Sequence, residues 1–263
     1  MGQRRSGWVL VMAVAALARA DVEPLRAAPA SSAHHKPRHA RHDARGSIVL
    51  NGERTKVHWS DGDSFRISEG KYEGKGTRLI GYNALEAYGP VHAWGGWTGA
   101  ELFELAEQSA GVAAAQAWAC TTDGKEEGYH RLLISCPELA VEMARTGYGM
   151  AYAVEGDTVA PAVLAAQADA QKNKRGMWKK GTAKGIVTSV HSVGEDGDEA
   201  AVKAYNRVVD TRTGKALRRP HGHTYKTCEQ VCEETDGERS CMLYVPFAMR
   251  YRHRPGCLFT APQ

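Results

Sequence analysis

Beyond its first twenty residues, the sequence has no apolar run long enough to cross a bilayer as a helix, which takes about 20 residues. It also lacks a broad positive charge in its larger part. Residues 1–46 hold 8 Lys and Arg against 3 Asp and Glu, whereas residues 47–263 hold 26 against 27. The larger part is therefore not predicted to bind nucleic acid through a general positive field, and any phosphate affinity must come from a few placed groups and a metal.

The first twenty residues have the parts of a secretory signal peptide. Two arginines, Arg4 and Arg5, precede a short apolar run, and an Ala-Arg-Ala sequence at 18–20 provides a cleavage site. We expect export to the periplasm or the medium, with cleavage after Ala20 and no membrane span afterwards; a membrane anchor is the alternative. Residues 21–46, rich in Ala, Pro, His and Arg, are predicted to be a disordered linker.

Six cysteines, an even number, predict disulfides in an exported chain. Cys120 and Cys136 flank a predicted hairpin, and a bridge between them would close a loop of about 17 residues, contributing about 3 kcal/mol. Four more cysteines in residues 186–263 allow three pairings. We favour the bridges Cys232–Cys241 and Cys228–Cys257. The alternative is a zinc site that uses His221 or His223.

Residues 61–86 carry the densest set of chemically useful side chains. Asp61 and Asp63 lie on an Asp-Gly-Asp turn, and two strand-like runs follow, the second beginning at Arg78. Asn83 and Glu86 close the stretch. Two neighbouring strands would thus bring carboxylates, an amide oxygen and a guanidinium to one rim. Hard cations bind several oxygens, and a phosphodiester matches the planar fork of arginine, so this stretch predicts a phosphate site with a metal.

Three motifs in order resemble the active-site segments of the staphylococcal nuclease (thermonuclease) family, including its exported bacterial members. That family carries DGD[TS], then R-L-x-x-[VI]-D-x-P-E, then [DE]-x-Y-G-R, and ends in G-[IL]-W. The matching segments here are DGDS at 61–64, RLIGYNALE at 78–86, EGYHR at 127–131 and GMW at 176–178. The resemblance covers about residues 47–181, and the joint occurrence of ordered motifs is more specific than any one of them.

The resemblance implies a role for each matched residue. Asp63 and Asn83 would bind Ca²⁺ or another divalent cation, with Asp61 behind them, and Tyr129 and Tyr152 would contact the substrate. The catalytic residues would be Arg78 and Arg131, which clamp the phosphate, and Glu86, which contacts the attacking water.

Three positions depart from the family pattern. Asn83 replaces the metal-binding Asp, which removes one charge and predicts weaker Ca²⁺ binding. Leu85 replaces the Pro before Glu86, and His130 replaces the Gly of Y-G-R. These departures concern the strength of the metal site and the direction of Glu86.

Short strands followed by helices predict an α+β fold. The resemblance implies a small five-stranded OB-type barrel at 47–181, and we expect about three helices packed on it, at 98–110, 138–146 and 157–174. Strand-like runs at 113–120 and 129–136 are expected to pair. An aromatic stretch at 88–97 is predicted to be a loop that either faces substrate or covers the barrel. Residues 186–263 should form a small disulfide-rich module with strands at 186–193 and 205–209 and a helix at 224–234. A basic-aromatic cluster at 250–254 either touches nucleic acid or is solvated.

The leading hypothesis is an exported, monomeric, Ca²⁺-dependent hydrolase that cleaves phosphodiester bonds of DNA or RNA, the resemblance implying 3′-phosphate products. The alternative is a non-catalytic nucleic-acid-binding or cell-surface module with a degenerate metal site, favoured by Asn83. A further hypothesis is that residues 186–263 attach the protein to a partner in the cell envelope.

Overall fold

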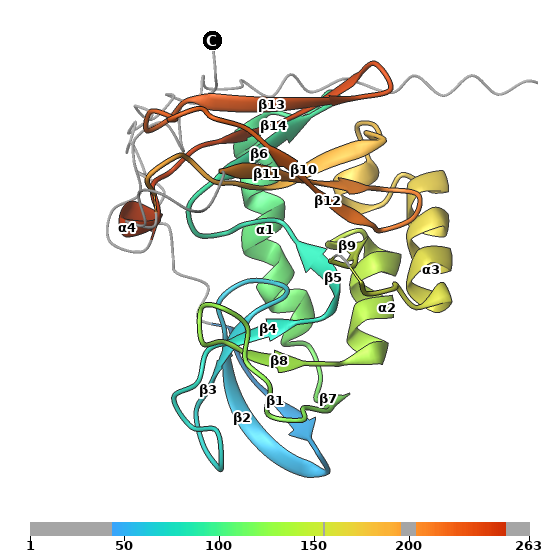
Figure 1. The fold of residues 1–263 in the computed structure, drawn as a ribbon. Coiled ribbons are helices and arrows are strands. Elements are labelled where there is room, and N and C mark those ends of the chain that lie inside the picture. The colour runs from blue at the N-terminus through green and yellow to red at the C-terminus, as the bar shows by residue number, and fades with distance from the viewer. Residues whose placement is uncertain (1–43, 155, 196–203, 251–263) are drawn as a thin grey trace, which may run out of the picture. The chain divides into compact units, whose positions relative to one another are not determined.

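The computed structural model describes residues 44–154, 156–195 and 204–250, which all belong to one compact unit. Strands and helices are mixed in it, so the predicted α+β class is confirmed (Figure 1). The predicted signal peptide and most of the predicted linker lie outside the described residues. The described part contains no helix long and apolar enough to span a membrane.

The N-terminal sheet has the strand order β3-β2-β1-β7. Its members are β1 (Ala44–Leu50), β2 (Glu53–Trp59), β3 (Phe65–Ile67) and β7 (Trp118–Cys120). The turn between β1 and β2 is Asn51-Gly52, and both residues have positive φ, which suits the tight turn of an antiparallel hairpin. Alternate residues of β2 and β3 point inward, and they carry the largest buried side chains of this sheet, among them Trp59 and Phe65.

Two short ladders connect this sheet to the rest of the unit. β4 (Thr77–Leu79) pairs in parallel with β8 (Leu132–Ile134), and β5 (Gly81–Ala84) pairs antiparallel with β9 (Gly149–Tyr152). Among the described residues these ladders do not close into a barrel, so the α+β class is established without the five-stranded OB-type barrel.

The C-terminal strands form two three-stranded sheets. One has β10 (Gly185–Val190), β11 (Tyr205–Asp210) and β12 (Ala216–Pro220). The other joins β13 (Gln230–Thr235) and β14 (Glu238–Leu243) to β6 (Val91–Trp94). The predicted loop at 88–97 is therefore wrong over β6, because β14 offers its edge as a distant pairing partner that no local pattern reveals.

Four helices lie within the described residues: α1 (Gly99–Ala113), α2 (Pro137–Thr146), α3 (Pro161–Lys172) and α4 (Phe247–Arg250). α1 starts with a capping box, in which the side chains of Thr98 and Glu101 each bond the other residue's backbone amide. The helix predicted at 157–174 is shorter at both ends than expected. α3 starts after Ala160, because Pro161, with its fixed φ, opens the first turn. A 3₁₀ turn, η1 (Gly176–Trp178), follows.

Both predicted disulfides that the described residues can show are confirmed. Cys120 bonds Cys136, and Cys232 bonds Cys241 as a directly opposed pair across β13 and β14. The predicted Cys228–Cys257 bridge involves Cys257, which lies outside the described residues.

Two secondary-structure predictions near these cysteines are wrong. The runs at 113–120 and 129–136 do not pair with each other as strands, because β7 pairs with β1 and β8 with β4. Isolated antiparallel bridges join the segment after β7 to residues of the second run, at Thr121–Ser135 and Glu126–Leu132. The predicted helix at 224–234 is instead a turn followed by β13. Cys228 has φ +69, outside the right-handed helical region, and β13 is held by its full antiparallel pairing with β14.

Candidate functional site

The Asp-Gly-Asp turn at 61–63 is fixed by its own side chains and by β4 and β5. One carboxylate oxygen of Asp61, Oδ1, accepts hydrogen bonds from the Asp63 amide at 3.1 Å and the Ser64 hydroxyl at 2.5 Å. The Tyr82 hydroxyl donates to the Gly62 carbonyl at 2.6 Å. The amide of Leu79 donates to the Asp63 carbonyl at 3.0 Å. This turn is therefore a rigid support for Asp63 rather than a loose loop.

Arg78 lies between Asp63 and Asn83. Its Nη1 is 3.1 Å from Asp63 Oδ2, and its Nη2 donates to Asn83 Oδ1 at 2.5 Å. The guanidinium also lies over the Tyr152 ring, 5.6 Å from its centre. The amide of Ala84 donates to Asp63 Oδ2 at 3.1 Å. Residues from the turn, β4, β5 and β9 thus meet in one polar cluster.

Burial and mutual repulsion set the protonation of this cluster. The pKa of Asp61 is raised well above its usual value, first by burial and then by the charges of Asp63 and Glu86. Burial is the largest single effect and lowers the pKa of Arg78, but Asp63, Tyr152, Glu86 and Asp61 together outweigh it and the net shift is upward. Arg78 is therefore held charged, although its side chain is only 19% exposed.

Glu86 follows β5 and is half-buried beside the same cluster. Its pKa is raised, mainly by burial and then by the charge of Asp63, while Arg78, Arg250 and Arg131 oppose the shift. A carboxylate with a raised pKa, surrounded by guanidinium groups, is suited to accept a proton next to a bound anion.

Arg131 faces the cluster from the segment between β7 and β8. Its Nε donates to Glu127 Oε1 at 2.8 Å. Burial is the largest single effect and lowers the pKa of Arg131, but the hydrogen bond to Glu127 and the charges of Glu127 and Asp63 together outweigh it, so the net shift is upward. Smaller effects come from Arg78 and Asp63, which places Arg131 within electrostatic reach of both.

The structure therefore brings together most of the residues that the sequence predicted. The residues that gather here are Asp61, Asp63, Arg78, Asn83, Glu86 and Arg131. Tyr152 lies beneath Arg78 and is 7% exposed, whereas Tyr129 is 49% exposed, with Arg131 over its ring. The two tyrosines thus have different surroundings, Tyr152 buried inside the cluster and Tyr129 exposed beside Arg131.

Arg250 is a member of this neighbourhood that the motifs did not identify. It belongs to α4, and its charge acts on Glu86. Its only signal in the sequence was the basic-aromatic cluster at 250–254, the rest of which lies outside the described residues. No spacing rule connects position 250 to position 86, so sequence reasoning could not place the two together.

The carboxylate and amide oxygen atoms of the cluster are of the type that hard cations bind. Asp61 and Asp63 supply carboxylates whose repulsion contributes to the raised pKa of Asp61, and a cation would offset that repulsion. Asp63 Oδ2 and Asn83 Oδ1 both contact Arg78, so a cation would share these atoms with the guanidinium. Within the described ranges, no three His, Cys, Asp or Glu side chains are arranged as a metal site.

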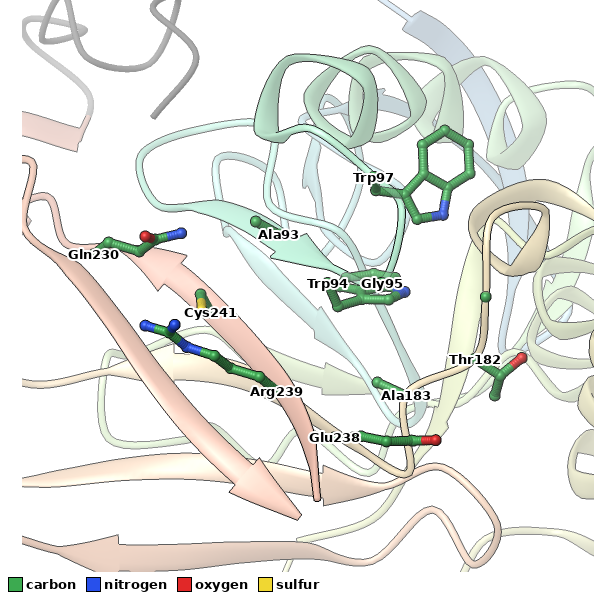
Figure 2. A pocket seen from close by; sticks show the side chains of 11 residues that line it. Ala93, Trp94, Gly95, Trp97, Thr182, Ala183, Gln230, Glu238, Arg239 and Cys241 are labelled. Carbon is green, nitrogen blue, oxygen red and sulfur yellow. The ribbon is translucent and has the colours of Figure 1, made fainter. Parts of the chain in front are cut away.

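A separate cavity of about 570 Å³ lies between β6, β13, β14 and the segment after η1 (Figure 2). Trp94 and Trp97 line it on one side and Gln230 and Arg239 on the other. Its lining includes none of the predicted catalytic, metal-binding or substrate-binding residues. This cavity and the charged cluster around Arg78 therefore occupy different places.

No protein-family model, no curated protein and no solved structure matches the chain. The resemblance to staphylococcal nucleases consequently remains a hypothesis from the ordered motifs in the sequence.

Proposed function

We propose that this protein is an exported, divalent-metal-dependent nuclease that hydrolyses phosphodiester bonds of DNA or RNA. The observation that carries the proposal is the buried contact of Arg78 with Asp63 and Asn83, with Glu86 and Arg131 within electrostatic reach of it. In this proposal the strands around the Asp-Gly-Asp turn correspond to the OB-type barrel that the motifs imply. The two disulfides are compatible with export.

The roles follow from charge and position. Arg78, on β4, and Arg131, in the segment just before β8, would hold the phosphate through planar forks and stabilise the negative charge that grows on it. Glu86 would accept a proton from the attacking water. Asp63, Asn83 and Asp61 would hold Ca²⁺ or a similar ion, which supplies positive charge that polarises the phosphate.

Two tyrosines take different roles in this proposal. Tyr152, buried under Arg78, would orient that guanidinium through its ring face. Contact with the substrate, which the motifs imply for both tyrosines, is assigned first to the exposed Tyr129.

A non-catalytic module that binds nucleic acid or a cell-surface component is the second candidate. It is favoured by one observation: Arg78 already engages the Asn83 oxygen that a metal would need, and Asn83 carries no charge of its own. Such a protein would bind nucleic acid without cutting it.

Digestion of single-stranded DNA and RNA, with Ca²⁺ or with EDTA, separates the two candidates. We expect cutting in Ca²⁺ alone, a loss of at least about a hundredfold in Arg78→Ala, and near-normal cutting in the surface control Arg145→Ala. Arg145 pairs with Glu142 on α2, outside the cluster. Binding that persists in every condition without cleavage would favour the non-catalytic module.

Ca²⁺ binding gives a second readout that does not depend on activity. Calorimetric titration should detect Ca²⁺ binding to the native protein and weaker binding to Asp63→Asn, which lacks one charged oxygen. A raised midpoint of thermal unfolding in Ca²⁺ should accompany it, since a ligand of the folded state stabilises that state. Equal behaviour of the two proteins would contradict a cation at Asp63.

A further inference from the structure

Two arginines face each other across the C-terminal sheet. Arg207 on β11 is directly opposite Arg218 on β12 in the antiparallel register, so the two side chains lie on one face of the sheet. Like charges at opposed positions repel each other and destabilise a sheet. Among the residues that the structure describes, the guanidinium groups contact Tyr205, and neither pairs with a carboxylate. The pair is therefore two positive charges held close together.

The opposite face of β12 is arranged differently. Arg219 Nη1 lies 2.9 Å from Glu233 Oε2 and also donates to the Glu234 carbonyl at 2.9 Å. Because successive residues of a strand point to opposite faces, Arg219 points toward β13 while Arg218 points away from it. The sheet thus neutralises the arginine of one face with an acid, and within the described ranges it provides no such acid for the two arginines of the other face.

A cavity of about 250 Å³ lies at this second face, lined by Val154, Arg207, Ala216 and Arg218. The Arg207 side chain is half-buried and Arg218 is exposed. The two guanidinium carbons are 5.3 Å and 4.9 Å from the centre of the Tyr205 ring, in the same order. A guanidinium that rests on a ring keeps N–H donors in its own plane for an anion. Since one water occupies about 30 Å³, the cavity has room for a phosphate group.

This cavity is joined to the candidate site through the end of β9. Val154 comes two residues after Tyr152, whose ring lies under Arg78. Between them, the Ala153 carbonyl accepts a hydrogen bond from the Ala216 amide at 2.9 Å, so the start of β12 is bonded to the chain that leaves β9 (Figure 1). Two extended residues span about 7 Å, a short step along a nucleic-acid strand.

Electrostatics also connect the two places. The pKa of His191 is lowered to about 4, first by burial and then by the charge of Arg250 and the charges of the two arginines in the cavity. Arg250 acts in turn on Glu86. The positive charges beside the candidate site and those in the cavity therefore reach one shared side chain.

We propose that Arg207 and Arg218 form a second phosphate site, which holds a phosphate close to the one at Arg78 on the same nucleic-acid strand. A guanidinium offers paired N–H donors to phosphate oxygens, and the charge of the phosphate offsets the repulsion between the two arginines. The inference rests on the proposed function and adds to it a substrate-binding site in residues 186–263, outside the recognised motifs. A free phosphate ion has the same chemistry, so the test includes it.

The salt dependence of binding in EDTA tests the proposal without cleavage. The probes are a fluorescent oligothymidylate of about eight nucleotides and a thymidine dinucleotide, whose lone phosphate fills only the site at Arg78. The double variant Arg207→Gln/Arg218→Gln should weaken oligothymidylate binding about tenfold at low salt. It should also reduce the slope of log K against log salt by about 0.7, the contribution of one neutralised phosphate on a single strand. Binding of the dinucleotide should be unchanged.

Two further double variants control for charge and for shape. Arg54→Gln/Arg145→Gln removes two charges elsewhere, from exposed positions on β2 and α2, and should leave the oligothymidylate slope unchanged. Arg207→Lys/Arg218→Lys keeps the charges and should retain the slope with a smaller loss of affinity, because an ammonium group lacks the planar fork. Urea denaturation verifies that each variant is folded. An unchanged slope in the Arg207→Gln/Arg218→Gln variant, or an equal loss for both probes, would overturn the second site.

Calorimetric titration with inorganic phosphate identifies the source of the anion. Inorganic phosphate should compete with oligothymidylate for the native protein. If it binds the native protein and not the Arg207→Gln/Arg218→Gln variant, while the oligothymidylate slope is the same in both, the site holds a free ion and the assignment to a strand is wrong.

The same measurements distinguish failure of this inference from failure of the proposed function. Native protein that cuts DNA or RNA, with an Arg207→Gln/Arg218→Gln variant that binds and cuts like the native protein, would overturn the second site alone. Native protein that binds oligothymidylate with the expected loss in that variant, but cuts nothing in Ca²⁺, would retain the site in a non-catalytic module and contradict the nuclease. Absence of both binding and cutting would contradict both.

Discussion

Arg78 and Asp63 form an ion pair, with 3.1 Å between Nη1 and Oδ2, in a place where both side chains are largely shielded from water. Such a pair adds little net free energy of folding, because the cost of desolvating both charges offsets their Coulomb attraction. Removing one partner, however, leaves the other charge buried and unpaired. The same pair joins the Asp-Gly-Asp turn to β4, so its loss should affect both the site and the stability of the fold.

Replacing Arg78 by Met, which keeps the apolar stem, should lower the free energy of unfolding by about 3 kcal/mol at neutral pH. Arg78→Lys should lose less, because it retains a positive charge but cannot contact Asp63 and Asn83 together as the planar fork does. Urea denaturation measures both. The exposed pair Arg145–Glu142 provides the control, since Arg145→Met should cost under about 1 kcal/mol. Equal losses at positions 78 and 145 would mean that burial of the pair has no consequence.

Gly62 has no room for a side chain. A Cβ there would lie 2.7 Å from Met143 Cε and 2.8 Å from Ser109 Oγ. Gly62→Ala should therefore move the turn off helices α1 and α2 and lower the free energy of unfolding by about 1–3 kcal/mol. It should also weaken Ca²⁺ binding, because Asp61 and Asp63 flank it.

Gly111 supplies the matched control, since it lies within α1 and a Cβ there would meet nothing within 4 Å. Gly111→Ala should stabilise the protein by about 0.5–1 kcal/mol, through the higher helix propensity of alanine. Chemical denaturation of the two variants should thus give shifts of opposite sign. Shifts of the same sign would show that the tight packing around Gly62 is not what decides its cost.

The Cys120–Cys136 disulfide closes a sequence separation of 16 residues around the segment that carries Arg131. Replacing both cysteines by Ala should lower the free energy of unfolding by about 3 kcal/mol in the chain-entropy model and should make the segment more sensitive to limited proteolysis. The Cys232–Cys241 double variant, with a separation of 9, should lose slightly less stability and leave proteolysis of residues 121–131 unchanged. Cleavage at the same rate in both variants would contradict a role of the first disulfide in holding Arg131.

His92 should make the protein less stable in acid. Burial lowers its pKa to about 4 from the ordinary 6.5, with the Val187 backbone opposing the shift. Between these values the unfolded chain binds more protons than the folded one, so the free energy of unfolding should decrease as pH falls from 6.5 to 4, by up to about 3 kcal/mol.

His92→Leu should reduce that slope, whatever its effect at neutral pH, and denaturation curves at several pH values measure it. His130→Asn is the control, because the His130 side chain is 91% exposed and Asn tolerates the positive φ of that position. An unchanged slope in His92→Leu would assign the acid sensitivity to other groups, such as His191, whose pKa burial also lowers to about 4.

The sequence by itself determined those features that depend on neighbours in the chain. The α+β class, the capping box of α1, the left-handed end of α2 at Gly147 and the early strands follow from local periodicity and turn chemistry. The gathering of Asp63, Arg78 and Asn83 was also predictable, because ordered motifs carry it and those residues lie within about twenty positions of one another.

Only the tertiary structure decided which distant strands pair and what surrounds the site. β6 forms because it pairs with β14. A helix was expected at 224–234 from the spacing of Cys228 and Cys232, but antiparallel pairing with β14 makes the end of that segment the strand β13 instead. Arg250 reached Glu86 through the same long-range assembly. Local patterns report the preferences of a chain segment, whereas pairing and burial between remote segments depend on the whole fold, and it is those contacts that set the charges around Glu86.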